Sequence, residues 1–193
     1  MHRGYYVRKY GREENTLKKR EEGWISKLAG VLGLIGFVSV LVYAINPSWL
    51  SWAALSLPLW LRWMGVGISL LGFILLQWAQ NTLGKSWSDT PRMIKEQLLI
   101  TSGPYQFIRH PIYTAFLLIL GSTLLISANW LIGITWIGMT VLEVLSRIGF
   151  EERLMLEYFG NQYREYMNRT GRLLPRIIVV MTEVVTPTKP KSD

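Results

Sequence analysis

The stretch Ile112–Leu145, IYTAFLLILGSTLLISANWLIGITWIGMTVLEVL, decides the fold of this chain. It holds two apolar blocks, 112–127 and 130–145, which are joined only by Ala128 and Asn129. Crossing a membrane core of about 30 Å takes roughly 20 helical residues, so each block is somewhat short for a crossing. The stretch predicts a tight helical hairpin inside a membrane.

Two more apolar blocks precede this hairpin. Residues 25–45 are interrupted only by Lys27, and residues 59–78 only by Arg62. Half of all residues are hydrophobic, and they fall in long blocks rather than in the short periodic stretches of a soluble helical domain. We therefore expect an all-α, multi-pass transmembrane bundle of about four membrane helices, with the lipid bilayer as a partner.

The basic residues test this division independently. Of the 21 Lys and Arg, eight lie in 3–27, four in 85–109 and eight from 147 onward, while the connections 46–58 and 128–129 hold none. By the positive-inside rule, this alternation predicts four crossings with both termini and the middle loop in the cytoplasm. The net charge of +8 then needs no nucleic acid, because basic flanks beside anionic lipid account for it.

The composition also excludes several kinds of site. The chain has no cysteine, which removes disulfides, thiol nucleophiles and zinc–thiolate sites. His2 and His110 are the only histidines, so we expect no metal. No cleavable signal peptide is expected, since 1–22 is charged, and no Rossmann fingerprint is present.

The run Gly103–Tyr113, GPYQFIRHPIY, carries polar residues from a loop into an apolar helix. Pro111 suits the first turn of that helix, which places His110 at the helix start. Exposed backbone N–H groups there favour an anionic ligand group such as a carboxylate. The alternative is a histidine that only caps the helix or contacts lipid head groups.

A second group of polar residues lies at the end of the hairpin. Glu143, Arg147 and Glu151 are spaced four apart, so a continuous helix places them on one face and lets the arginine pair with either carboxylate. Glu143 falls within the apolar block, where an ionisable group costs several kcal/mol unless it is paired or faces a wet cavity. This favours a polar interior face over a structural ion pair that reaches toward the interface.

Four motifs in the C-terminal half carry a resemblance to a known family. They are Gly-x-Tyr-x-x-x-Arg-His-Pro-x-Tyr at 103–113, Arg-x-x-x-Glu-Glu-x-Leu at 147–154, Phe-Gly-x-x-Tyr-x-x-Tyr at 159–166 and Thr-Gly-Arg-Leu-Leu-Pro at 170–175. In order and spacing they resemble the isoprenylcysteine carboxyl methyltransferase family.

That resemblance implies an integral-membrane enzyme that uses S-adenosylmethionine, enclosed between the loop, the hairpin and the C-terminal helix. Arg147 would hold the methyl acceptor, with Glu143 restraining the arginine, and Arg147 and Glu151 would be the catalytic pair. A carboxylate acceptor is already ionised at neutral pH, so in-line transfer to it needs no strong base. Carried over onto this sequence, the cofactor contacts are Leu98, Leu99, Ile100, Tyr105, His110, Pro111, Ile112, Tyr113 and Glu151.

The resulting division of the chain follows these motifs. It comprises a basic cytoplasmic arm (1–23), two transmembrane helices (24–80), a cytoplasmic cofactor loop (81–111), the transmembrane hairpin (112–147), a C-terminal catalytic and amphipathic helix (148–176) and a tail (177–193) that is disordered at least from 186.

Several alternatives remain open at this point. The lipophilic acceptor could be a phospholipid amine, a thiol or a phenol; an amine or a phenol would need Glu151 or Glu143 as a base. A sterol-type reductase would use NADPH and predicts more membrane helices and a basic pocket for the 2′-phosphate. A non-catalytic membrane scaffold would make Arg109, His110, Arg147 and Glu151 replaceable.

Overall fold

The computed structural model describes residues 23–84 and 99–176, and within these ranges the chain is helical. The β-type pairing found there is limited to two isolated bridges, Ala54 with Asn129 and Ile108 with Gly171. The expectation of an all-α fold is therefore confirmed. The expectations for the N-terminal arm up to residue 22, for Leu98 and for the tail from 177 lie outside the described residues.

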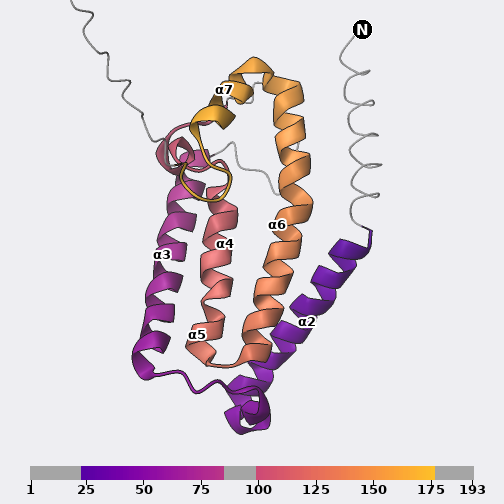
Figure 1. The fold of residues 1–193 in the computed structure, drawn as a ribbon, viewed down its shortest axis with the longest axis vertical. Helices are drawn as coiled ribbons and strands as arrows, with labels where there is room; N and C mark the ends of the chain where they lie inside the picture. The colour runs from indigo at the N-terminus through magenta and orange to yellow at the C-terminus, as the bar shows by residue number, and fades with distance from the viewer. Residues whose placement is uncertain (1–22, 85–98, 177–193) are drawn as a thin grey trace, which may run out of the picture.

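Two long helices, a broken third and a long fourth make up the body of the molecule (Figure 1). In chain order the elements are α2 (Trp24–Ile45), η1 (Pro47–Ala53), α3 (Leu59–Leu83), η3 (Gly103–Gln106), α4 (Pro111–Gly121), α5 (Thr123–Ser127), α6 (Trp130–Phe159) and α7 (Asn161–Arg169).

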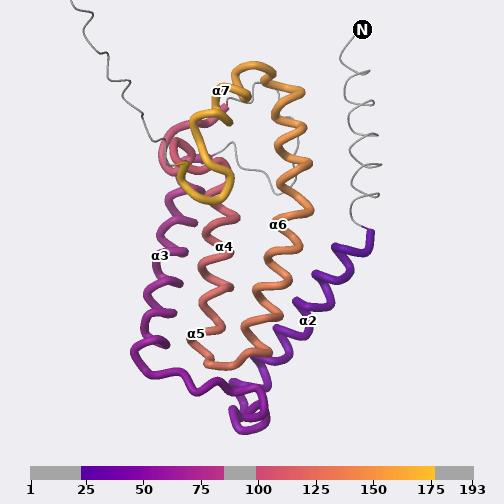
Figure 2. Tube along the Cα trace, in the orientation of Figure 1, coloured from indigo at the N-terminus to yellow at the C-terminus, as the bar shows by residue number. Residues whose placement is uncertain are grey.

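The helices stand side by side in the order α3, α4 with α5, α6, α2 (Figure 2). α3 packs on α4 and α5, both of these pack on α6, and α2 packs on the other side of α6. The contact between α3 and its neighbours is close, since a Cβ atom added at Gly65 or Gly72 would lie 2.7 Å from the Leu125 or Ile119 side chain. Small residues at such crossings are typical of helix packing in membranes.

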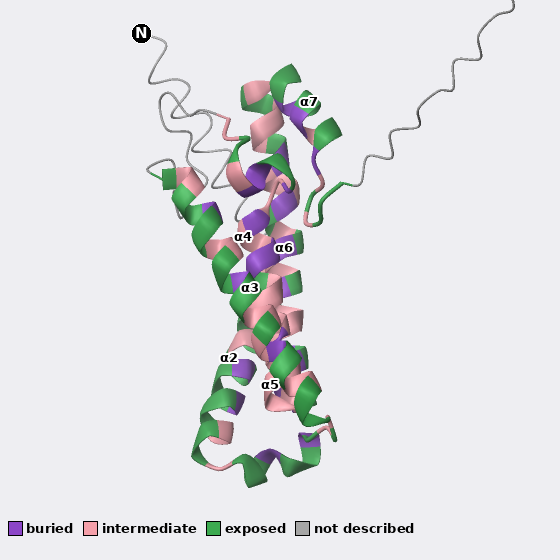
Figure 3. Ribbon diagram, turned by 90° about the vertical axis from the view of Figure 1, so that its left-hand side faces the viewer, coloured by how far each residue is buried: buried purple, intermediate pink, exposed green. Residues whose placement is uncertain are grey.

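Exposed residues run along much of this row of helices (Figure 3), and many of those on α2 and α3 are large and apolar. Within the described ranges, α2, α3 and α6 are long and apolar enough to cross a membrane. In α2 and α3 most of the apolar residues are exposed rather than packed inside the protein, as a lipid environment requires. The structure thus supports a multi-pass membrane protein.

The segment expected to be the third crossing is shorter and interrupted. Pro111–Ser127 is apolar but has fewer than 18 residues, and it divides into α4 and α5 at Ser122. The Ser122 and Thr123 hydroxyls donate to the carbonyls of Ile119 and Leu120, a local bonding that competes with the helical pattern and bends helices. Three helices of membrane-spanning length are thus described, where four crossings were expected.

A turn at Ala128 and Asn129 joins α5 to α6, as the sequence predicts. The side chain of Asn129 is buried, accepts from the backbone N–H of Ile132 and donates to the carbonyl of Leu50, so it caps α6 and ties it to η1. Arg62 of α3 donates to the carbonyl of Ile126 at the end of α5, through Nε at 3.1 Å and Nη2 at 2.9 Å. These contacts close the end of the bundle opposite α7.

The C-terminal helices differ from the expected division at 147/148. α6 continues without interruption from Trp130 to Phe159, because a change from apolar to charged residues does not end a helix. The expected catalytic and amphipathic helix (148–176) is divided at Gly160, whose φ of 54° lies in the region that favours glycine. After this turn α7 folds back over the end of the bundle that carries His110 (Figure 1).

Candidate functional site

The segment between η3 and α4 is held in place by the residues that follow α7. The backbone N–H of Arg109 donates to the carbonyl of Gly171 (2.8 Å), and that of His110 donates to the carbonyl of Arg172 (3.1 Å). In the first turn of α4, the Thr114 hydroxyl donates to the carbonyl of Leu173 at 2.7 Å. The C-terminal segment therefore fixes the start of α4 from outside.

One group of charges beneath this segment is centred on a carboxylate that is closed off from solvent. Arg109 donates through Nε to Glu152 at 2.9 Å, with side chains 9% and 5% exposed, and Arg172 pairs with the same carboxylate. Arg109 also donates through Nη1 to the carbonyls of Met167 (3.0 Å) and Thr170 (2.5 Å), beyond α6. We refer to Arg109, Glu152 and Arg172 as the buried arginine cluster.

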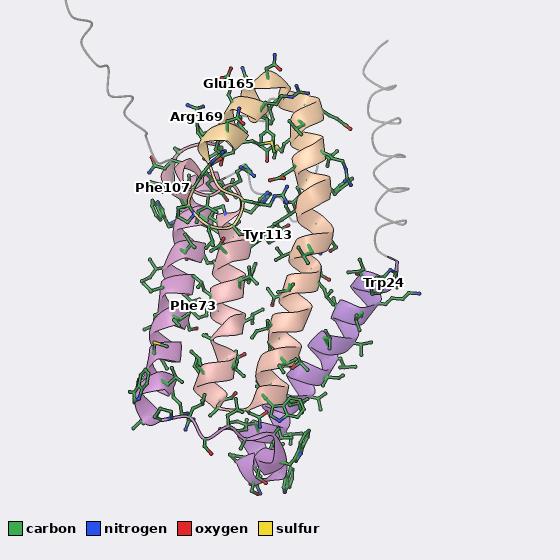
Figure 4. The ribbon with its side chains drawn as sticks, in the orientation of Figure 1. Trp24, Phe73, Phe107, Tyr113, Glu165 and Arg169 are labelled. Carbon is green, nitrogen blue, oxygen red and sulfur yellow. The ribbon has the colours of Figure 1, made fainter. Side chains whose placement is uncertain are left out.

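A second group of polar side chains lies between α4 and α6, near the labelled Tyr113 in Figure 4. The Tyr113 hydroxyl donates to Glu151 at 2.5 Å and also lies close to Arg147. Arg147 donates through Nε to Glu143 at 3.0 Å, which confirms that a continuous helix puts the pair within bonding distance. Tyr113, Glu143, Arg147 and Glu151 are called the α4–α6 polar face below.

His110 lies between these two groups. Its Nδ1 is 3.6 Å from a Glu151 oxygen, its Nε2 is 3.4 Å from a Glu152 oxygen, and its ring stacks on Tyr113 with centroids 5.6 Å apart. Nε2 is buried and makes no hydrogen bond with any described residue. Nε2 therefore faces Glu152 of the buried arginine cluster, and Nδ1 faces Glu151 of the α4–α6 polar face.

Three tyrosines pack where α7 meets η3. The Tyr166 hydroxyl donates to the carbonyl of Tyr105 at 2.6 Å, and the rings of Tyr163 and Tyr166 lie 5.8 Å apart. Burial raises the pKa of Tyr166 to about 12 and raises the pKa of Tyr105 and of Tyr163 above the ordinary value as well. All three phenols stay neutral at physiological pH and act as packing groups, and the Tyr166 hydroxyl is also a hydrogen-bond donor.

The structure brings some of the expected site residues together and separates others. His110, Tyr113, Glu143, Arg147 and Glu151 form one continuous group. Tyr105 instead is buried beneath α7, with its carbonyl bound to Tyr166. The other expected cofactor contacts are Leu99 and Ile100, half-buried ahead of η3, Pro111, buried at the start of α4, and Ile112, half-buried in its first turn.

Sequence reasoning missed the role of Glu152 and did not assign partners to Arg109 and Arg172. Successive residues of an α-helix point about 100° apart, so Glu151 and Glu152 cannot face the same surroundings. One feature of the sequence could have indicated this. Arg109 and His110 are adjacent in one motif and Glu151 and Glu152 are adjacent in another, so each glutamate can pair with a residue of the first motif.

The comparisons with known proteins cover this same region. Residues 65–157 match the family model "Isoprenylcysteine carboxyl methyltransferase (ICMT) family", a range that includes the α4–α6 polar face and Glu152. Protein-S-isoprenylcysteine O-methyltransferase B of Arabidopsis thaliana is 31% identical over 118 residues, which are 60% of each chain. Methanethiol S-methyltransferase 1 of Bradyrhizobium diazoefficiens is 32% identical over 53% of this chain and 33% of its own length.

A solved structure resembles this fold as well. It is that of the eukaryotic intramembrane Ras methyltransferase ICMT, with a TM-score of 0.58 and 25% sequence identity over 79% of this chain and 52% of that one. The chain thus spans less than two thirds of the length of each of these three proteins. The resemblance stated from the four motifs is confirmed by sequence and by fold.

Proposed function

We propose that the chain is an integral-membrane methyltransferase of the isoprenylcysteine carboxyl methyltransferase family, to which it is similar in sequence and in fold. Its methyl donor is S-adenosylmethionine, and its acceptor is a carboxylate on a lipophilic molecule such as an isoprenylcysteine. The observation that carries the proposal is the α4–α6 polar face, which lies inside the matched range in a bundle of membrane-length helices.

The residues around His110 fit such a donor. The Nδ1 of His110, on the side of Glu151, can bind a polar group, and the start of α4 favours a carboxylate. The ring of Tyr113 offers an apolar surface, and Glu151 accepts hydrogen bonds from an amine or from ribose hydroxyls. When bound, S-adenosylmethionine supplies an electrophilic methyl group on a sulfonium. Further contacts are assigned to Leu98, Leu99, Ile100, Tyr105, Pro111 and Ile112.

Arg147 is assigned to the acceptor. Its planar guanidinium can bind a carboxylate through two parallel hydrogen bonds, which fixes the direction of the oxygen that receives the methyl group. Alignment of this kind supplies several kcal/mol of the barrier lowering. Because the carboxylate is ionised at neutral pH, Glu151 does not have to remove a proton. In this proposal Arg147 and Glu151 orient the reactants.

The surroundings support a lipophilic acceptor and a cytoplasmic site. The apolar outer faces of α2 and α3 are suited to lipid, so an isoprenoid chain can approach through the bilayer. By the positive-inside rule, the distribution of basic residues along the sequence supports a cytoplasmic location for the site and for both termini.

Methyl transfer by the purified protein tests the proposal. The full chain in detergent is given S-adenosylmethionine with a labelled methyl group and N-acetyl-S-farnesylcysteine, and the product is assayed as a base-labile methyl ester. We expect saturable ester formation. S-adenosylhomocysteine and NADPH are titrated in parallel, and binding of NADPH alone would favour a reductase instead.

A thiol acceptor is the second candidate, and the similarity to methanethiol S-methyltransferase 1 is the observation that favours it. A thiol has to lose its proton, for which Glu151 is the available base. The same assay with methanethiol in place of the farnesylcysteine separates the two, because a thioether is stable to base whereas a methyl ester is not.

A further inference from the structure

We propose that Glu143 occupies the acceptor's place on Arg147, so that the acceptor's carboxylate and Glu143 compete for one guanidinium during each turnover. This inference rests on the proposed function, and it assigns Glu143 a role in acceptor affinity and product release.

The geometry shows one carboxylate paired with Arg147 and a second carboxylate bonded by Tyr113. The Nε of Arg147 is 3.0 Å from Glu143 Oε2, and no other ion pair of Arg147 occurs among the described residues. Glu151, four residues further along, is instead bonded by the Tyr113 hydroxyl. Arg147 therefore has Glu143 as its carboxylate partner.

The side chains of the Arg147–Glu143 pair are much more exposed than Arg109 and Glu152 of the buried arginine cluster, so this pair can separate more easily. The side chains of Arg147 and Glu143 are 57% and 32% exposed, against 9% and 5% for Arg109 and Glu152. Because the Arg147–Glu143 pair is made by a single Nε–Oε2 contact within one helix, a carboxylate ligand that binds Arg147 through two parallel hydrogen bonds can displace it.

Arg147 needs a carboxylate partner when no acceptor is bound. The pair lies among apolar residues of α6, where a lone guanidinium is costly. With no acceptor bound, Glu143 supplies the compensating charge. The carboxylate of an incoming acceptor then binds Arg147 beside Glu143 or in place of it. The two negative charges, on the acceptor and on Glu143, repel each other.

Methyl transfer reverses this competition. The acceptor oxygen forms the O–CH₃ bond as the S–CH₃ bond breaks, the sulfonium becomes a neutral thioether, and the anionic acceptor becomes a neutral ester. The ester is a weaker partner for Arg147 than a carboxylate is. Glu143 can therefore return to Arg147 and favour release of the product.

The test compares the acid and its methyl ester as ligands. Wild type, Glu143→Gln and Glu165→Gln are saturated with S-adenosylhomocysteine in detergent and titrated with N-acetyl-S-farnesylcysteine or with its methyl ester. Glu143→Gln keeps the shape and a hydrogen-bond acceptor but loses the charge. Glu165, exposed on α7, is the matched control for loss of one glutamate charge (Figure 4).

We expect Glu143→Gln to bind the acid about tenfold more tightly, from removal of a charge a few ångströms away, and the ester by less than threefold. The affinity for S-adenosylhomocysteine stays within twofold of wild type, and Glu165→Gln behaves as wild type. The inference is overturned if Glu143→Gln binds the acid no more tightly, or if acid, ester and S-adenosylhomocysteine all shift together. A wild type that methylates the farnesylcysteine while Glu143→Gln fails this test leaves the proposed function standing; a wild type that binds no S-adenosylhomocysteine removes both.

Discussion

Glu151 and Glu152 are neighbours on α6, yet they belong to two different regions of the molecule. Glu152 is 5% exposed and is bound by Arg109 and Arg172, whose backbones also join the start of α4 to the C-terminal segment. Glu151 is 26% exposed, faces α4 and is bound by the neutral Tyr113. The buried arginine cluster is fully paired within the protein, whereas the α4–α6 polar face keeps groups that can still bind a ligand.

This difference separates the charged residues that stabilise the fold around the site from those that can bind a ligand in it. A charge that is buried and paired on several sides contributes to the fold, since removing one partner leaves the others uncompensated. A charge with one partner and access to solvent can exchange that partner. The following predictions test this division from the largest expected effect to the smallest.

Arg109→Ala should have the largest effect, and the effect should be on stability. It leaves Glu152 buried with only the half-exposed Arg172 and His110 beside it, and it deprives the carbonyls of Met167 and Thr170 of their donor, so we expect a loss of about 3–5 kcal/mol. Thermal unfolding in detergent measures it. The control Arg164→Ala, on the exposed side of α7, should stay within about 0.5 kcal/mol of wild type. Equal melting temperatures for the two variants would refute a structural role for the cluster.

Arg147→Ala should affect acceptor binding and leave the fold intact. Removing the guanidinium eliminates a charge-assisted, bidentate contact, which we expect to raise KM for the farnesylcysteine roughly 30-fold or more. The affinity for S-adenosylhomocysteine should stay within about threefold of wild type in a calorimetric titration. If donor affinity collapses while acceptor affinity does not, the assignment of Arg147 to the acceptor is wrong.

Tyr113→Phe should weaken donor binding and spare stability. The substitution keeps the ring that stacks on His110 and removes only the hydroxyl that restrains Glu151. Without this hydroxyl Glu151 is no longer held in the position from which it binds the donor, so we expect the Kd of S-adenosylhomocysteine to rise by about tenfold. The melting temperature without ligand should change by at most a few degrees. A large drop there would place Tyr113 with the structural residues.

Arg172→Ala should have the smallest effect of the four. Arg172 belongs to the buried arginine cluster through Glu152, but its own side chain is 54% exposed and is therefore screened by solvent. We expect a loss of about 1 kcal/mol or less in thermal unfolding, well below that of Arg109→Ala. A loss as large as that of Arg109→Ala would mean that the cluster depends on both arginines equally.

The sequence predicts the apolar blocks, the turn at Ala128 and Asn129, and the spacing that joins Arg147 to Glu143, because all of these depend on residues close together in the chain. It does not predict that α4 ends at Ser122 or that α6 runs on to Phe159, since serine and charged residues are compatible with either outcome. Nor does it separate Glu151 from Glu152. Their roles depend on how α6 is rotated toward α4 and toward Arg109, which is a property of the packed bundle.

The most direct test of the central claim, that Glu151 serves the ligand while Glu152 serves the fold, is a calorimetric titration with S-adenosylhomocysteine. The titration is run on purified wild type and on Glu151→Gln, with the melting temperature of each recorded alongside. The account predicts saturable binding of about one equivalent by wild type and at least tenfold weaker binding by Glu151→Gln at a nearly unchanged melting temperature. Absence of saturable binding by wild type, or equal affinity for both proteins, would contradict it.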